Sequence, residues 1–131
     1  MTTALTPALA LDYVRELSAD VVAGVVLDAS GECLAGDEHL AEASRALPDA
    51  ASIHGETEHG QVFAARDDTH SIVVVTGPFA LARVTRRDLL TALSALGGQT
   101  GPSGAETTLP EAVTRALLSA AHEPFRRPRA V

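Results

Sequence analysis

The stretch Ser71-Ile-Val-Val-Val-Thr76 decides the fold of this 131-residue chain. Its four consecutive β-branched apolar residues stand between Asp67-Asp68 and Gly77-Pro78, with no polar residue among them. β-branched side chains favour strands, and a strand without a polar face is buried on both sides. The stretch therefore predicts a central strand with helices packed against both of its faces.

The composition predicts a single globular domain and excludes several classes of function. A chain of this length makes about one domain, and 46% of its residues are hydrophobic. All ten basic residues are arginine, which excludes Schiff-base lysines and phosphate-loop lysines. The net charge is −7, with −8 in residues 1–96 and +1 in residues 97–131. Because this acidic body has no basic stripe, we expect neither nucleic acid nor a membrane as a partner.

The single cysteine, Cys33, rules out an intramolecular disulfide framework. We expect Cys33 within a strand, where a packing role is favoured over that of a nucleophile. No apolar run approaches the length of about 18 residues that a membrane span needs, and the first residues do not resemble a secretory signal. These observations predict a cytoplasmic protein.

The remaining segments predict the neighbours of the central strand. Asp28-Ala-Ser-Gly31 has the residues of a type I turn between two apolar runs, which predicts a hairpin. Three runs within residues 52–76 predict an antiparallel meander. The expected elements are a helix from Pro7 to about Ser18, strands at 21–27 and 32–35, a helix at about 37–47, strands at 52–57, 61–66 and 71–76, and a leucine-rich helix that Gly97-Gly98 ends.

The leucine-rich helix is expected to begin at Thr85-Arg-Arg-Asp88, with Thr85 as its N-cap. Arginines in a first turn oppose the helix dipole, so an earlier start near Phe79 is the alternative. The glycine-rich residues 97–107 lack the Lys-Ser/Thr of a phosphate loop, and we interpret them as a linker. Thr108-Leu-Pro-Glu111 has the spacing of a capping box and predicts one more helix.

These elements predict an α+β fold: a five-stranded antiparallel sheet with helices on both faces, in the order helix-β-β-helix-β-β-β-helix, plus an appended C-terminal helix. We expect a folded domain at residues 1–97, a flexible linker at 98–108, and an appended helix with a basic tail at 109–131. The helix at 37–47 has a thin apolar face, which makes it a candidate for contact with a partner. A short surface helix on its own sheet is the alternative.

The pattern Val22-Ala-Gly-Val-Val-Leu-Asp-Ala-Ser-Gly-Glu-Cys-Leu-Ala35 resembles that of the roadblock/dynein-light-chain family. The similar region is about residues 8–97, and the Gly55…Gly60 hairpin, the Ile72–Val75 run and the closing leucine helix support it. The resemblance lies in an apolar pattern with a turn and includes no catalytic signature. A related profilin-like domain could produce much of the same pattern.

The resemblance implies a homodimer or heterodimer that pairs the helix at 37–47 and the strand at 52–57. It implies a non-enzymatic scaffold or regulator of small Ras-like GTPases, without a cofactor. We therefore expect a homodimeric module that binds a small GTPase or a related signalling protein. The alternative is a profilin-like sensory domain that binds a small molecule in a pocket with convergent polar groups. The residues expected at the dimer interface are Leu40, Ala43, Leu47, Ile53 and His54.

Arg83, Arg86 and Arg87 cluster at the entry to the leucine-rich helix and are candidates for partner binding. An arginine can stabilise the charge of phosphoryl transfer in trans. The alternative is that these arginines are solvated charges at the end of a helix.

His54, Glu56 and Glu58 fall at i, i+2 and i+4 on one face of a predicted strand. Imidazole and carboxylate groups can bind zinc or a similar ion, which gives a weaker hypothesis of a metal-dependent enzyme. The spacing matches no common zinc motif, and no Ser-His-Asp triad is evident. We therefore expect no catalytic, cofactor or metal site.

Overall fold

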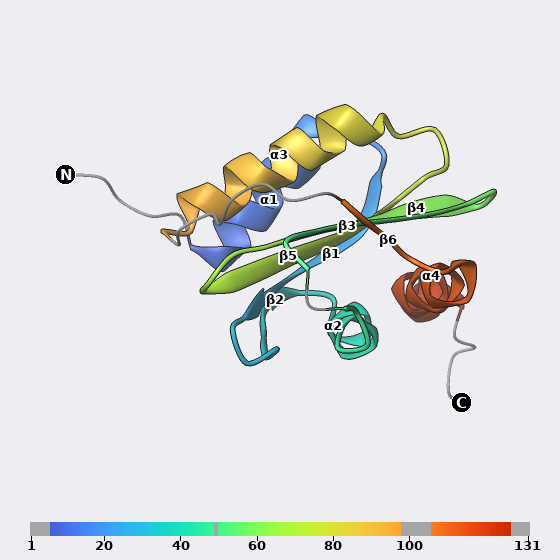
Figure 1. Ribbon diagram of the computed structural model, residues 1–131, viewed down its shortest axis with the longest axis horizontal. Helices are drawn as coiled ribbons and strands as arrows, with labels where there is room; N and C mark the ends of the chain where they lie inside the picture. The colour runs from blue at the N-terminus through green and yellow to red at the C-terminus, as the bar shows by residue number, and fades with distance from the viewer. Residues whose placement is uncertain (1–5, 49, 98–105, 127–131) are drawn as a thin grey trace.

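The computed structural model describes residues 6–48, 50–97 and 106–126, which form one sheet between two layers of helices (Figure 1). The layer above the sheet in Figure 1 contains α1 and α3, and the layer below it contains α2 and α4. The elements are α1 Pro7–Leu17, β1 Val21–Asp28, β2 Cys33–Gly36, α2 Glu38–Ser44, β3 Ser52–Thr57, β4 Gly60–Arg66, β5 His70–Thr76, α3 Ala82–Ala95, β6 Thr107–Thr108 and α4 Glu111–Arg126.

The strands lie in the order β2-β1-β5-β4-β3-β6. The predicted central strand is confirmed, because β5 pairs antiparallel with β1 on one side and with β4 on the other. The prediction of five antiparallel strands was wrong in detail: within the described residues the sheet has six strands and is mixed, since β6 pairs in parallel with β3. Two threonines after a glycine-rich stretch carry no periodicity, so the sequence does not reveal this sixth strand.

The sheet separates two apolar cores, which explains why β5 has no polar face. Ile72 and Val74 point into the core under α1 and α3, whereas Val73 and Val75 point into the core under α2 and α4. All four side chains are 1% exposed or less. The unbroken valine run therefore supplies both cores at once.

The helix starts agree with the sequence at two places and differ at a third. The Thr6 hydroxyl accepts a hydrogen bond from the amide of Leu9, and the Asp37 carboxylate accepts from the amides of His39 and Leu40, so both act as N-caps. Thr85 does not cap α3, because it is buried inside the helix. The helix begins at Ala82, as the alternative start near Phe79 anticipated.

Candidate interaction surface

The outer edge of β3 and one side of α2 are covered by residues 106–121, which we call the C-terminal segment. Thr107 and Thr108 pair with Ile53 and His54. The amide of Leu109 then donates a hydrogen bond to the carbonyl oxygen of His54 at 2.9 Å. Beyond it, α4 packs against α2 and β3 (Figure 1). The segment thus completes both the sheet and the α2/α4 layer.

The residues predicted for a dimer interface contribute to this part of the fold. Leu40 and Ile53 are buried, and they share one apolar core with Leu109 and Leu117 of the C-terminal segment. Ala43 and Leu47 are partly buried against the same core, and the side chain of His54 is 17% exposed. The chain therefore occupies this surface with its own residues. Pairing of the surface with a second copy stays a prediction.

Two glycines of the β3–β4 hairpin make room for the C-terminal segment. A Cβ atom at Gly55 would overlap the hydroxyl oxygen of Thr114 and lie 3.0 Å from Cβ of Leu109. A Cβ atom at Gly60 would lie 2.6 Å from the carbonyl oxygen of Thr76 in β5 and 3.0 Å from Cδ2 of Leu118, so Gly60 is required first by the neighbouring strand. The sequence marks both glycines as hairpin residues, but their contacts with α4 depend on positions almost 60 residues further along the chain.

Glu106 connects the C-terminal segment to α3 and to the edge of the sheet. One carboxylate oxygen pairs with the guanidinium of Arg86, and the other lies 3.8 Å from Nδ1 of His54. Of the three arginines predicted for partner binding, Arg86 therefore pairs with Glu106, and Nε of Arg87 lies 3.9 Å from the Asp88 carboxylate. The Arg86 side chain is 40% exposed, compared with 73% for Arg87.

A buried amide, Gln61, ties this edge to the loop before α3. Its Oε1 lies 2.8 Å from Nε2 of His54, and its Nε2 donates to the carbonyl oxygens of Pro78 at 3.1 Å and Ala80 at 2.9 Å. The His54 ring also stacks on Phe63, with ring centroids 4.6 Å apart. Because Gln61 is only 2% exposed, these bonds fix the loop firmly. Nothing in the sequence distinguishes Gln61 from an ordinary strand residue.

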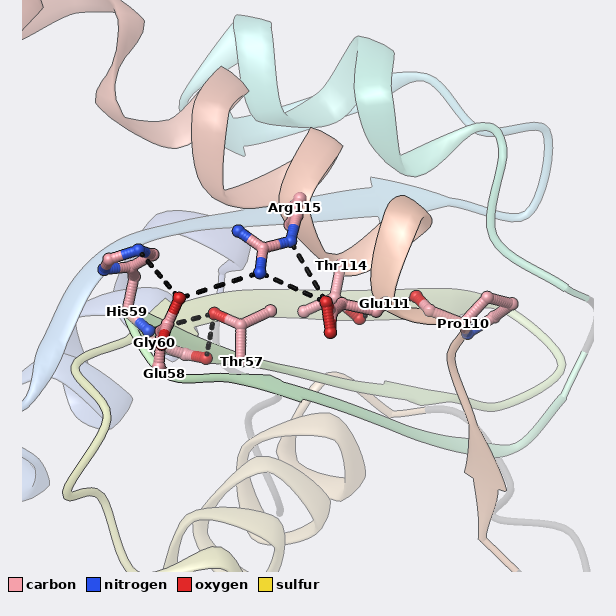
Figure 2. A network of polar contacts seen from close by, with 8 residues as sticks. All are labelled: Thr57, Glu58, His59, Gly60, Pro110, Glu111, Thr114 and Arg115. Atoms are coloured by element: carbon pink, nitrogen blue, oxygen red, sulfur yellow. Dashed lines mark hydrogen bonds and ion pairs between the residues drawn. The ribbon is translucent and has the colours of Figure 1, made fainter.

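Figure 2 shows how α4 is attached to the β3–β4 turn. The guanidinium of Arg115 lies 3.1 Å from the Glu111 carboxylate and 3.8 Å from that of Glu58. Glu58 in turn lies 3.4 Å from the His59 ring. All of these side chains are substantially exposed, so the network adds less to stability than the buried contacts of the segment.

The residues of the metal hypothesis are not brought together. Strand β3 ends at Thr57, so Glu58 leaves the face that carries His54 and turns toward α4 instead. Among residues 6–48, 50–97 and 106–126, no three His, Cys, Asp or Glu side chains form a group able to hold a metal ion. Cys33 lies in β2, as expected, and burial followed by the charge of Glu38 raises the pKa of its thiol.

Exposed apolar side chains gather on the α1/α3 layer. Of the seven large apolar or aromatic side chains exposed in the described part of the chain, six belong to α1, α3 or the loop before α3. Phe79 and Leu81 are 88% and 70% exposed on that loop, and the exposed Arg83 follows them in the first turn of α3. Arg83 and Arg87 lie four residues apart, on one side of the helix.

A cleft of about 560 Å³ opens beside the β1–β2 turn, the end of α2 and the β4–β5 turn. Two carboxylates on its wall organise their own turns. Asp28 accepts from the amides of Ser30 and Glu32 at 2.9 Å, and Asp67 accepts from the amide of His70 at 2.8 Å. The hydroxyl of Ser30, and then the amide of Glu32, lower the pKa of the Asp28 carboxyl.

Solved structures of known proteins share this architecture. A roadblock/LC7 domain from Streptomyces avermitilis matches with a TM-score of 0.59 and 19% identity, over 66% of this chain and 93% of that domain. A second structure of a roadblock/LC7 domain from Streptomyces avermitilis matches with a TM-score of 0.56 and 13% identity, over 72% of this chain and 95% of that one. The chain has the roadblock/LC7 fold. No protein-family model matches its sequence, and no curated protein matches it.

The roadblock/LC7 fold confirms the resemblance that the first hairpin and the valine run indicate. The matches cover nearly all of each known domain, whereas about a third of this chain lies outside the first match. None of the helices in the described residues has the length and apolar character needed to cross a bilayer.

Proposed function

We propose that this chain is a non-enzymatic scaffold or regulatory module of the cytoplasm that binds a small Ras-like GTPase or a related signalling protein. The roadblock/LC7 fold supports the general class of module. The observation that carries the proposal of a protein partner is the exposed surface formed by Phe79, Leu81, Arg83 and Arg87, which we call the Phe79 surface.

The Phe79 surface has the composition of a binding site rather than of ordinary solvent-facing surface. Aromatic residues and arginine are enriched where proteins meet, and two neighbouring apolar side chains lose contact with water when a partner covers them. The hydrogen bonds of Gln61 hold the Phe79 loop in place before any partner arrives, so little ordering is needed on binding. We propose that carboxylates of the GTPase pair with Arg83 and Arg87 around this apolar centre.

The proposal is tested by titrating the chain with purified Ras-like GTPases of its native host, each loaded with GDP or with a non-hydrolysable GTP analogue. At least one GTPase should bind, with different affinities in the two nucleotide states. Phe79→Ser, and separately Arg83→Glu with Arg87→Glu, should each weaken binding at least about tenfold, which corresponds to about 1.4 kcal/mol.

The matched control is Arg45→Glu, a charge reversal at the exposed end of α2 in the opposite layer. It should bind the GTPase as the unchanged chain does. The proposal fails if no GTPase binds, or if the Phe79 and arginine variants bind as well as this control.

We also propose that the scaffold pairs as a homodimer through the edge of β3 and the helix α2, as the sequence resemblance implies. Both elements are covered by the C-terminal segment of the same chain, so this pairing requires the segment to move away.

A second candidate function is the binding of a small molecule, which the volume of the cleft beside Asp28 and Asp67 favours. A fragment library screened by NMR tests it. Ligands of this cleft should shift the amide signals of Gly31, Ser44 and His70 together, because all three residues line its wall. If no fragment shifts these signals, the cleft is not a ligand site.

A further inference from the structure

The two edges of β3 are paired to different extents. On the inner side, all six residues of β3 are in register with β4. On the outer side, β6 pairs with only two of them, Ile53 and His54. A strand edge presents free N–H and C=O groups and is a ready template for another strand, so proteins cover such edges or use them for docking.

The C-terminal segment packs closely against this edge and against the core beneath it. Leu109, Leu117 and Ala121 are each 4% exposed or less, in a core that they share with Ile53 and Leu40. The missing side chain of Gly55 leaves the space that Thr114 and Leu109 occupy. Residues of the segment and residues of the surface therefore both contribute to this close packing.

Polar contacts hold the segment at its start and near the middle of α4. Glu106 pairs with Arg86 of α3 and approaches His54 just before β6. Arg115 reaches the β3–β4 turn at Glu58 (Figure 2). The segment is therefore held by α3, by the edge of β3 and by the turn, all within one chain.

We propose that the C-terminal segment is a removable cap on the self-association surface: with the cap in place the chain is a monomer, and displacement of the cap lets β3 and α2 of two copies pair. The choice of β3 and α2 as the pairing surface rests on the proposed function. The occupant that replaces the cap is a second copy of this chain. An antiparallel pair of β3 strands related by a two-fold axis can use the whole length of β3, whereas the cap uses two residues in the less stable parallel arrangement.

The first test measures the mass of the full chain by size-exclusion chromatography with light scattering. The unchanged chain should have the monomer mass of 13.5 kDa. Leu117→Asp places a charge in the core beneath the cap without altering β3 or α2, and it should shift the mass to twice that value. Ala116→Asp, at the neighbouring exposed position of α4, is the matched control and should stay monomeric.

The second test traps the cap covalently. In a Cys33→Ser background, His54→Cys and Thr108→Cys place two thiols at paired positions of β3 and β6. Oxidation should give a disulfide within one chain, seen as a monomer on a non-reducing gel. Combined with Leu117→Asp, this disulfide should return the variant to the monomer mass, and reduction should restore the dimer.

Three results would overturn the cap. The first is an unchanged chain that is a dimer, together with a His54→Cys/Thr108→Cys disulfide that forms within each chain, because the chain would then dimerise with the cap in place. Another is a trap that bonds two chains to each other, and the last is a Leu117→Asp variant that is folded by circular dichroism yet monomeric. If Leu117→Asp does not fold, Leu109→Ala replaces it and is interpreted by the same criteria. Neither test measures partner binding. A result against the cap proposal therefore leaves the GTPase proposal unaffected, because the titration with GTPases tests that proposal separately.

Discussion

Gly55 and Thr114 lie so close together that a Cβ atom on Gly55 would overlap the Thr114 hydroxyl oxygen. Backbone of β3 and side chain of α4 are thus in direct contact at this point. We predict that Gly55→Ala lowers the free energy of unfolding by about 1–3 kcal/mol, as expected for a side chain forced into a packed core. Urea denaturation followed by circular dichroism measures the change.

Two further variants make this test specific. Gly77→Ala is the matched control, because a Cβ atom there meets nothing within 4 Å, and it should change stability by less than about 0.5 kcal/mol. Adding Thr114→Ala to Gly55→Ala should recover part of the lost stability. If Gly55→Ala were as stable as Gly77→Ala, the close packing of α4 on β3 would be incorrect.

Gln61 provides a second prediction, because its buried amide satisfies two carbonyl groups of the Phe79 loop. Gln61→Leu leaves the carbonyl oxygens of Pro78 and Ala80 without this donor and should lower the free energy of unfolding by about 1–3 kcal/mol. The variant should also weaken GTPase binding through the Phe79 surface, since the loop is no longer fixed. Urea denaturation measures the stability of Gln61→Leu, and limited proteolysis measures the exposure of the Phe79 loop. If neither changes, Gln61 does not fix this loop.

The Asp28 turn predicts a dependence of stability on pH. Hydrogen bonds from the Ser30 hydroxyl and the Glu32 amide lower the pKa of Asp28 from its ordinary value of 3.8. The ionised carboxylate therefore stabilises the fold above that pH, and the contribution is lost as the pH falls through the lower folded-state pKa. Asp28→Ala should reduce the Tm at neutral pH, and the difference from the unchanged chain should shrink below pH 3.8.

The control for this experiment is Asp12→Ala, on the exposed side of α1. Its Tm should follow that of the unchanged chain across the same range of pH. If the difference in Tm between Asp28→Ala and the unchanged chain grew as the pH fell, the predicted sign of the Asp28 effect would be wrong.

The parts of the fold that the sequence predicts are those decided by neighbouring residues. The unbroken run of Ile72–Val75 predicts a strand with two buried faces, and Thr6-Pro7 predicts the start of α1; both are confirmed. The prediction of Thr85 as N-cap was wrong, because α3 begins at Ala82 without a side-chain cap and Thr85 is buried within the helix.

The parts that the sequence does not reveal depend on contacts between distant segments. Strand β6 is defined by pairing with β3, more than 50 residues earlier, and the role of Gln61 depends on the loop at Pro78–Ala80. The sequence places the three arginines together, but in the structure Arg86 pairs with Glu106, whereas Arg87, near the Asp88 carboxylate, and Arg83 are more exposed. No local pattern distinguishes these three side chains.

Closure of the sheet by its own C-terminal segment is the claim on which this account depends. Hydrogen exchange of the Leu109 amide, followed by NMR at a concentration where the protein is monomeric, tests it most directly. Because this amide donates to the His54 carbonyl, it should exchange far more slowly than an unstructured peptide amide, yet faster than the amides between β3 and β4, since the cap opens without unfolding the sheet. Exchange at the rate of an unstructured peptide, in a chain whose other strands are protected, would contradict it.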